Sequence, residues 1–264
     1  MSPTTPPQPS QPLQVLIFTK TSSYRHTSIE PAIAALTRLS ATTQQPGTSH
    51  PTPISVTTSS SATIFTPSSL SRFSAILLLQ NSGAFLTAPQ LASLRAYVRA
   101  GGGVVGVHCA AAGMLAGEDP DPDPERWYGR LLGGAFAGHP EPQRGVVRVV
   151  DAGHGIVRGT VGKGEGRWWV EEGEGNGWRW EWFDEWYNFK ENPRLAGDVH
   201  VLLSVDEGSY EGGEHGEDHP IAWCQEFEGG RSFYTALGHF DEAYEDEAFM
   251  GQLLNGILWV ARII

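Results

Sequence analysis

Apolar runs separated by polar turns recur along the N-terminal half of the chain at the spacing of an α/β fold. The most apolar run, at 104–107, contains three valines and no polar residue, as expected of a strand that is covered on both faces of a parallel sheet. Similar runs predict strands at 13–19 and 75–79, and amphipathic segments predict helices at 29–39 and 87–100. Because strands alternate with helices, we expect right-handed crossovers and a parallel, doubly wound sheet.

The pattern changes in the C-terminal half, where aromatic and polar residues alternate. Residues 178–189 begin with a tryptophan at every second position, which is typical of an antiparallel strand. The other predicted elements are strands at 54–57, 145–150, 199–205, 219–227 and 231–237, a short helix at 127–132 and a final helix at 248–264. The stretch 162–177 is rich in Gly and Glu, and we expect it to be a flexible loop. The sequence therefore predicts a mostly parallel central sheet with antiparallel additions in its C-terminal half.

No internal repeat and no clean linker divides the chain of 264 residues, of which 40% are hydrophobic. This length and composition suffice for one large core, so we predict a single domain over 13–264. Residues 1–12 consist mainly of Pro, Ser, Thr and Gln. They lack the basic and apolar regions of a secretory signal, and we expect them to form a disordered tail.

Charge and cysteine content restrict the partners and the compartment. A formal net charge of −12 at pH 7 argues against binding to nucleic acid or to an anionic membrane. No apolar run approaches the roughly 20 residues that cross a bilayer. The two cysteines, Cys109 and Cys224, cannot form a disulfide framework, and the sequence has no Asn-x-Ser/Thr sequon. We therefore expect a cytoplasmic protein without a nucleic-acid or membrane partner, and a homo-oligomer stays open.

Histidines are the sharpest chemical signal. Four of them, His26, His108, His139 and His239, lie where a predicted strand or short element gives way to a loop. In an open α/β sheet, ligands bind beyond the carboxyl ends of the strands. Further candidates are Asp184, Glu185 and His219. None of these residues forms a local zinc motif, so a site has to be assembled from distant segments.

Two chemistries remain open for such an assembly. Neutral imidazoles with a carboxylate bind Zn²⁺ or another divalent ion and lower the pKa of a bound water. Alternatively, imidazole and carboxylate exchange protons directly, because histidine titrates near neutral pH. Cys109 is a third candidate as a nucleophile, but a small buried residue is the favoured interpretation. Cys224 lies inside a predicted strand and is assigned to packing.

Aromatic residues have two interpretations as well. Tyr187 and Tyr210 are candidate partners of sugar hydroxyls, although such residues more often fill the edge of a core. The tryptophan-rich segment 168–186 is either a stacking platform for a ligand or the cover of one face of the sheet, and the cover is favoured.

Six motifs that contain most of these candidate residues follow one another along the chain. They are Tyr24-Arg-His26-Thr-Ser, Gly101-Gly-Gly-Val-Val-Gly-Val-His108, Gly133-Gly-Ala-Phe-Ala-Gly-His139-Pro, Asp184-Glu185-Trp-Tyr-Asn-Phe, Asp218-His219-Pro-Ile-Ala-Trp and Gly230-Arg-Ser-Phe-Tyr-Thr-Ala-Leu-Gly-His239. Taken together and in this order, they resemble the ThuA-like (trehalose utilisation) family over residues 13–262. The family belongs to the class I glutamine amidotransferase-like superfamily. The resemblance therefore implies a flavodoxin-like, three-layer α/β/α sandwich.

The resemblance to amidotransferases stops at the nucleophile. Their elbow has the form Gly-x-Cys-x-Gly, whereas this chain has Gly106-Val-His108-Cys109-Ala. Histidine stands where the nucleophile belongs and the cysteine is displaced by one residue, so we expect no glutamine hydrolysis. The segment His239-Phe-Asp241 resembles the His-x-Glu of the amidotransferase triad. The chain also departs from the usual family pattern at His154-Gly155 and at Phe240.

The resemblance implies an enzyme of sugar metabolism that hydrolyses or eliminates at a glycosidic bond of a disaccharide or keto-sugar derivative. We assign catalysis to His108, His239, Glu185 and Asp241, with Asp241 orienting His239. Substrate binding is assigned to His26, His139, Tyr187 and His219. A divalent metal, if one binds, is expected on His108, His139 and His239. The alternative is a non-catalytic sugar-binding or regulatory module on an amidotransferase-like fold.

Overall fold

The computed structural model describes residues 12–42, 53–115, 124–170, 177–196 and 198–264. The tail expected at 1–12 therefore lies outside the described residues, apart from its last member. The strands are Leu13–Phe18 (β1), Ile54–Ser59 (β2), Ala75–Leu79 (β3), Gly103–Val107 (β4), Phe136–Gly138 (β5), Gln143–Val149 (β6), Arg167–Val170 (β7), Trp178–Asp184 (β8), Asn188–Phe189 (β9), His200–Asp206 (β10), Pro220–Phe227 (β11) and Gly230–Thr235 (β12). The helices are Ile29–Thr42 (α1), Pro67–Leu70 (α2), Ala88–Arg99 (α3), Pro124–Leu132 (α4), Pro193–Ala196 (α5) and Glu247–Val260 (α6).

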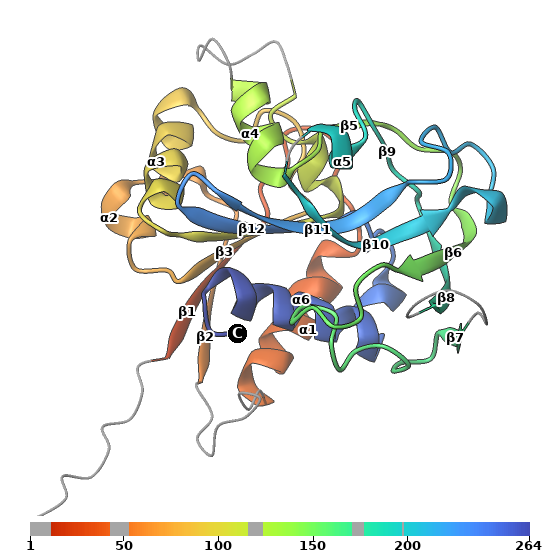
Figure 1. Cartoon of the computed structure of the whole chain (residues 1–264). Helices are drawn as coiled ribbons and strands as arrows, with labels where there is room; N and C mark the ends of the chain where they lie inside the picture. Colours follow the sequence, from red (N-terminus) through yellow and green to blue (C-terminus); the bar gives the residue numbers. More distant parts are fainter. Residues whose placement is uncertain (1–11, 43–52, 116–123, 171–176, 197) are drawn as a thin grey trace, which may run out of the picture.

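Among the described residues, ten strands form one continuous sheet in the order β2-β1-β3-β4-β12-β11-β10-β6-β8-β7. The first five strands in this order pair in parallel, and the remaining pairings are antiparallel. Strand β12 thus joins the two halves (Figure 1). The predicted fold class is confirmed: a parallel central sheet carries antiparallel additions in the C-terminal half.

Helices cover both faces of the sheet, which gives the three layers. Helices α1 and α6 lie on one side and α3 and α4 on the other (Figure 1). The alternation of side chains along β4 shows how both faces are filled. A Cβ at Gly103 would meet α6 at Val260, whereas a Cβ at Gly106 would meet α4 at Leu132. Both glycines therefore permit close packing of a helix on the strand.

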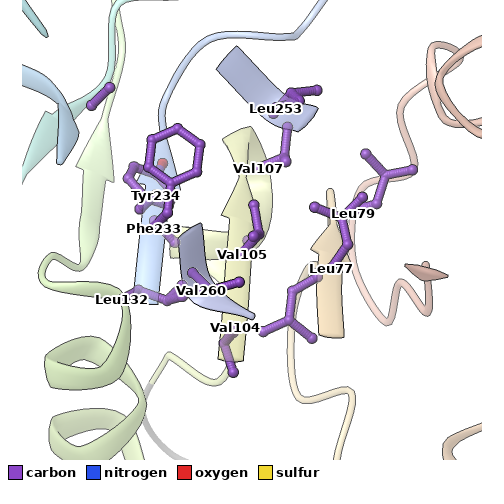
Figure 2. Close-up of a cluster of buried hydrophobic side chains, with 14 of the residues drawn as sticks. Leu77, Leu79, Val104, Val105, Val107, Leu132, Phe233, Tyr234, Leu253 and Val260 are labelled. Carbon is purple, nitrogen blue, oxygen red and sulfur yellow. The ribbon is translucent and has the colours of Figure 1, made fainter. Parts of the chain in front are cut away.

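The buried core has its centre at the parallel strands. Leu77, Val105 and Phe233 are paired across β3, β4 and β12 and are almost completely buried. Figure 2 shows these side chains together with Leu253 and Val260 of α6. Strands covered on both faces carry continuous apolar runs, which is why the sequence pattern identified them.

The prediction of a flexible loop over 162–177 is wrong for part of this stretch. Residues 167–170 form β7, which pairs with β8 so that Arg167 lies opposite Glu181 and Trp168 opposite Trp180. The two indoles stack with ring centroids 5.1 Å apart and planes inclined by 5°. Cross-strand aromatic pairs of this kind stabilise antiparallel strands. Trp168 and Trp180 therefore pack on one face of the β7–β8 pair; residues 171–176 lie outside the described part.

Three further features were not predicted. The chain leaves β4 through a 3-10 turn, His108–Ala112 (η2). The short strands β5 and β9 form a separate two-stranded sheet, and a 3-10 turn, Asp241–Tyr244 (η4), precedes α6. Within the described residues, no helix has the length and apolar character required to cross a membrane.

Candidate functional site

Four side chains from distant parts of the chain converge at one edge of the sheet. His26, His108, Glu185 and His239 each offer one ligand atom, and these atoms lie within 4.8 Å of one another. The three histidines follow the carboxyl ends of β1, β4 and β12, which are part of the parallel half. Glu185 follows β8, which runs in the same direction as β12 because four antiparallel pairings separate the two strands. We call these residues the histidine cluster; it lies where open α/β sheets bind ligands.

His108 is held in a defined tautomer at the end of β4. Its backbone has a φ of 51°, a left-handed conformation that is costly for a residue with a Cβ and is often found at functional turns. Nδ1 lies 2.6 Å from the carbonyl oxygen of Ala236. Because a carbonyl only accepts, Nδ1 carries the hydrogen and Nε2 of the neutral ring keeps its lone pair. This Nε2 accepts a hydrogen bond from the Tyr187 hydroxyl at 3.0 Å.

Glu185 lies at the centre of the cluster. Its Oε2 atom is 3.0 Å from Nδ1 of His239 and 3.4 Å from Nε2 of His108, and those two nitrogens are 3.2 Å apart. Burial raises the pKa of Glu185, but its close contacts with the imidazoles of His108 and His239 outweigh this effect and hold the pKa below its usual range. Glu185 is therefore a carboxylate under ordinary conditions.

His26 completes the cluster from the loop that follows β1. It is only 5% exposed, and its ring packs edge-to-face against the rings of His108 and His239 at 4.9 Å each. Burial, followed by the charges of His108 and His239, lowers the pKa of His26 to about 3. Its Nδ1 is buried and has no hydrogen-bond partner among the described residues. His26 is thus a neutral imidazole with an unused polar atom.

Asp184 connects the end of β8, which carries Glu185, with the turn that carries His239. This buried carboxylate accepts backbone N–H groups of Gly238 at 2.9 Å, His239 at 3.2 Å and Glu185 at 2.9 Å, and the indole N–H of Trp182 at 3.0 Å. The two adjacent carboxylates therefore have different partners: Asp184 binds backbone N–H groups, and Glu185 faces the imidazoles.

Two residues that sequence reasoning missed fix the Gly238-His239 turn from the other side. Gln80 donates through Nε2 to the carbonyl of Gly238 at 2.6 Å, and Ser28 donates to the carbonyl of His239 at 2.6 Å. Gln80 has a φ of 52° and directly follows the fully buried strand β3. A long polar side chain directly after a buried apolar strand is a sequence signal that could have identified this position.

His139 and Tyr187 line the cluster. Nε2 of His139 lies 3.5 Å from Oε2 of Glu185, and Nδ1 donates to the carbonyl of Pro140 at 2.8 Å, so Nε2 of the neutral ring is free to accept a proton. The His139 side chain is 33% exposed, more than any member of the cluster. Its ring stacks on that of Tyr187, with the planes inclined by 17°.

Two of the predicted site residues lie elsewhere. His219 is buried beside Glu207 and Tyr210 and donates through Nε2 to the backbone carbonyl of Tyr187 at 2.8 Å, so it supports the site from behind. Asp241 is exposed at the start of η4, and within the described part of the chain it makes no hydrogen bond to His239. The expected orienting role is instead filled at the His239 backbone by Asp184.

Cys109 has the environment of a packing residue. It is buried, and burial raises the pKa of its thiol to about 12, which leaves almost no thiolate at neutral pH. Cys224 of β11 is buried in the same way, and burial also raises its pKa to about 12. The geometry therefore agrees with the favoured sequence interpretation of both residues.

A groove of about 1000 Å³ lies near the turn that carries His239, although no member of the histidine cluster is among the described residues that line it. It lies where β8 extends beyond the end of β7, and its lining includes the aromatic side chains Trp182, Phe183 and Phe240 together with acidic and basic groups. The ring of Phe240 lies 4.4 Å from that of His239. We call this feature the aromatic groove; Phe240 connects it with the cluster.

Comparison with solved structures agrees with this architecture. A putative ThuA-like protein from Bacteroides uniformis ATCC 8492 is 21% identical, with a TM-score of 0.67 over 98% of this chain and 95% of the other. A second one, from Parabacteroides merdae ATCC 43184, is 16% identical, with a TM-score of 0.66 over 95% and 90%. A cytoplasmic protein from Salmonella typhimurium LT2 is 14% identical, with a TM-score of 0.56 over 94% and 99%.

These likenesses establish the fold, and a family model establishes the relationship. A comparison with curated proteins found no significant match. The model of the family described as ThuA, trehalose utilisation, matches residues 14–260, a range that includes all the strands and helices described above except Leu13, the first residue of β1. The chain therefore belongs to the ThuA family.

Proposed function

We propose that the protein cleaves the glycosidic bond of a disaccharide in which one ring carbon has been oxidised to a ketone. The convergence of His26, His108, Glu185 and His239 within 4.8 Å of one another is the observation that carries this proposal. The description of the family, trehalose utilisation, supports a carbohydrate as the substrate.

The keto group accounts for a reaction that needs no nucleophilic cysteine. A ketone makes the hydrogen on the neighbouring carbon acidic. When a base removes this proton, the electron pair of the C–H bond forms an enolate. The enolate then expels the glycosidic oxygen from the next carbon, a C–O bond breaks, and the leaving oxygen takes up a proton. Later addition of water to the unsaturated sugar makes the overall outcome a hydrolysis.

His139 is the residue best suited to remove the proton. Its Nδ1 is bound to the Pro140 carbonyl, Nε2 keeps a lone pair, and the side chain is one-third exposed, so a substrate can reach it. A histidine also suits both directions of proton transfer near neutral pH. The protonated His139 would then supply the proton to the leaving oxygen.

We assign stabilisation of the negative charge on the enolate oxygen to His239, because Glu185 is itself a carboxylate, His26 is a neutral imidazole and Nε2 of His108 carries a lone pair. Such charge is stabilised best by groups that are fixed before the reaction. The hydrogen bonds from Gln80, Ser28 and Asp184 to the turn that carries His239 provide this rigidity. Trp182, Phe183 and Phe240 of the aromatic groove offer apolar faces on which the second sugar ring would stack.

The decisive assay compares oxidised and unoxidised trehalose as substrates of the full chain. We expect release of free sugar from the oxidised disaccharide only. Replacement of the base, His139→Gln, should lower kcat by about 10²–10⁴-fold. The matched control His200→Gln removes an exposed histidine at the start of β10 that pairs with Asp151, and it should leave the rate unchanged.

Two results would contradict the proposal. Cleavage of unoxidised trehalose at a similar rate would exclude the enolate route. Binding of sugars without turnover of any oxidised disaccharide would favour the alternative, a non-catalytic sugar-binding or regulatory module. We also propose a cytoplasmic location, which is supported by two unpaired cysteines and by the cytoplasmic relative from Salmonella typhimurium LT2.

A further inference from the structure

We propose that His26, His108, Glu185 and His239 bind one divalent first-row transition metal ion. In the reaction proposed above, the ion would polarise the keto oxygen, and to that extent its role rests on the proposed function. Its existence does not, because metal binding is measured without any substrate.

The distances within the cluster match those between ligands of a small ion. Zinc bonds of about 2.0–2.2 Å to nitrogen and oxygen place two ligands of a tetrahedral site about 3.3–3.6 Å apart. The three contacts among His108 Nε2, His239 Nδ1 and Glu185 Oε2 measure 3.2, 3.4 and 3.0 Å. These atoms form a nearly equilateral triangle, as three ligands of a tetrahedral site do. On average its edges are slightly shorter than those expected around zinc. The remaining ligand atom, from His26, lies within 4.8 Å of all three.

The hydrogen bond of His108 is of the kind that prepares a ligand. Histidines that bind metals usually donate their other ring N–H to a carbonyl or carboxylate, which fixes the tautomer and the ring orientation. His108 donates through Nδ1 to the Ala236 carbonyl. Nε2, which now accepts a hydrogen bond from the hydroxyl of Tyr187, would bind the metal through the same lone pair.

His26 provides the second, independent observation. Buried histidines are normally held by a hydrogen bond at each available nitrogen, because an unsatisfied buried polar atom costs about 1–3 kcal/mol. Nδ1 of His26 is buried without a partner among the described residues, although the residue is only 5% exposed. A ligand in the cluster explains why an imidazole is retained in this position.

The donor set indicates the class of metal. Three imidazoles and one carboxylate suit Zn²⁺ and its first-row neighbours, whereas Mg²⁺ and Ca²⁺ prefer oxygen alone. The carboxylate of Glu185 partly neutralises the ion. The set differs from the sequence-based expectation of His108, His139 and His239, because Glu185 and His26 replace His139. His139 is thereby left free for proton transfer.

The test is metal binding by the full-length protein after treatment with a chelator. The protein is incubated with Zn²⁺, freed of excess metal and analysed by mass spectrometry of its metal content; Co²⁺ serves as a spectroscopic probe, since its visible absorption reports the coordination geometry. We expect one equivalent of metal in the wild type. Glu185→Gln and His239→Gln, which keep side-chain size close to the original, should weaken binding at least tenfold, and His200→Gln should bind like the wild type.

Circular dichroism of each variant separates loss of a ligand from loss of the fold. The proposal is overturned if the folded wild type binds neither ion, or if Glu185→Gln and His239→Gln bind as tightly as the wild type. The experiments can also refute the metal site and the proposed reaction independently of each other. Cleavage of oxidised trehalose that survives complete removal of metal would refute the metal site as part of the reaction. A stoichiometric metal in a protein that cleaves no oxidised disaccharide would refute the reaction alone.

Discussion

At the scale of single residues, the site depends on polar side chains that never reach a substrate. The buried carboxylate of Asp184 accepts four N–H groups, and two of these belong to the turn that carries His239. Gln80 and Ser28 bind the carbonyls of the same turn. Fully satisfied buried networks of this kind define one conformation. The positions of His239 and Glu185 are therefore decided largely by their neighbours.

The environment of Cys109 makes a prediction at this scale. Because burial raises its pKa to about 12 and only the thiolate reacts, iodoacetamide at neutral pH should leave Cys109 unmodified in the native protein. The same thiol should react fully after unfolding in urea. Peptide mass spectrometry of both samples gives the result. Rapid, selective labelling of Cys109 in the native state would revive thiol chemistry at the elbow.

At the scale of elements, the contacts between helices and β4 leave no room for additional atoms. A Cβ at Gly103 would lie 2.5 Å from the carbonyl oxygen of Val260 at the end of α6. Gly129 in α4 differs, because its nearest neighbour would be Cβ of Ala135 at an ordinary 3.7 Å. The first glycine is needed for packing of a helix on the strand, and the second is not.

These two glycines form a matched pair for mutagenesis. Gly103→Ala should lower the free energy of unfolding by about 1–3 kcal/mol, because α6 has to move away from the sheet. Gly129→Ala should raise it by up to about 1 kcal/mol, since alanine favours the helix. Urea denaturation followed by circular dichroism measures both changes. A stabilising Gly103→Ala variant would show that the contact with Val260 is not rigid.

At the scale of the whole molecule, one continuous sheet brings the four parts of the cluster together. His26, His108, Glu185 and His239 lie after β1, β4, β8 and β12, and β8 is separated from β12 by three other strands. Residues 185–188 then run from the end of β8 back to the end of β4, where Tyr187 meets His108. Function at this site thus requires the antiparallel half of the sheet as well as the parallel half.

Burial of His26 makes the stability of the molecule depend on pH. Its pKa of about 3 in the folded state lies below the ordinary histidine value of 6.5, so as the pH falls the unfolded state takes up the proton before the folded state does. Stability is therefore full above pH 6.5 and falls as the pH decreases towards 3. Between pH 7 and pH 5, at 1.36 kcal/mol per unit, the metal-free wild type should lose about 2 kcal/mol more than His26→Gln.

Urea unfolding at the two pH values, after treatment with a chelator, measures this difference. The absolute stability of His26→Gln is not the readout; only the change with pH is compared, so a general effect of the substitution cancels. Equal losses in the two proteins would mean that His26 is protonated in the folded state.

Most of the fold was determined by local sequence patterns. The predicted strand at 75–79 has the same limits as β3, and the limits predicted for the strand at 13–19 differ from those of β1 by one residue. Strands buried on both faces carry uninterrupted apolar runs, and glycine and proline mark their ends. For the same reason the histidines could be assigned to strand ends before their distances were known.

Only the tertiary structure decided which of these side chains meet. Residues 167–170 have no strong strand pattern of their own and become β7 because β8 offers a partner for each of them. His219 and Asp241 looked as suitable as His26, but the first is held by Glu207 and Tyr187 and the second lies in an exposed turn. Strand order, pairing and the twist of a sheet are properties of long-range contacts. The local sequence therefore supplied the candidates, and the packing of ten strands selected four of them.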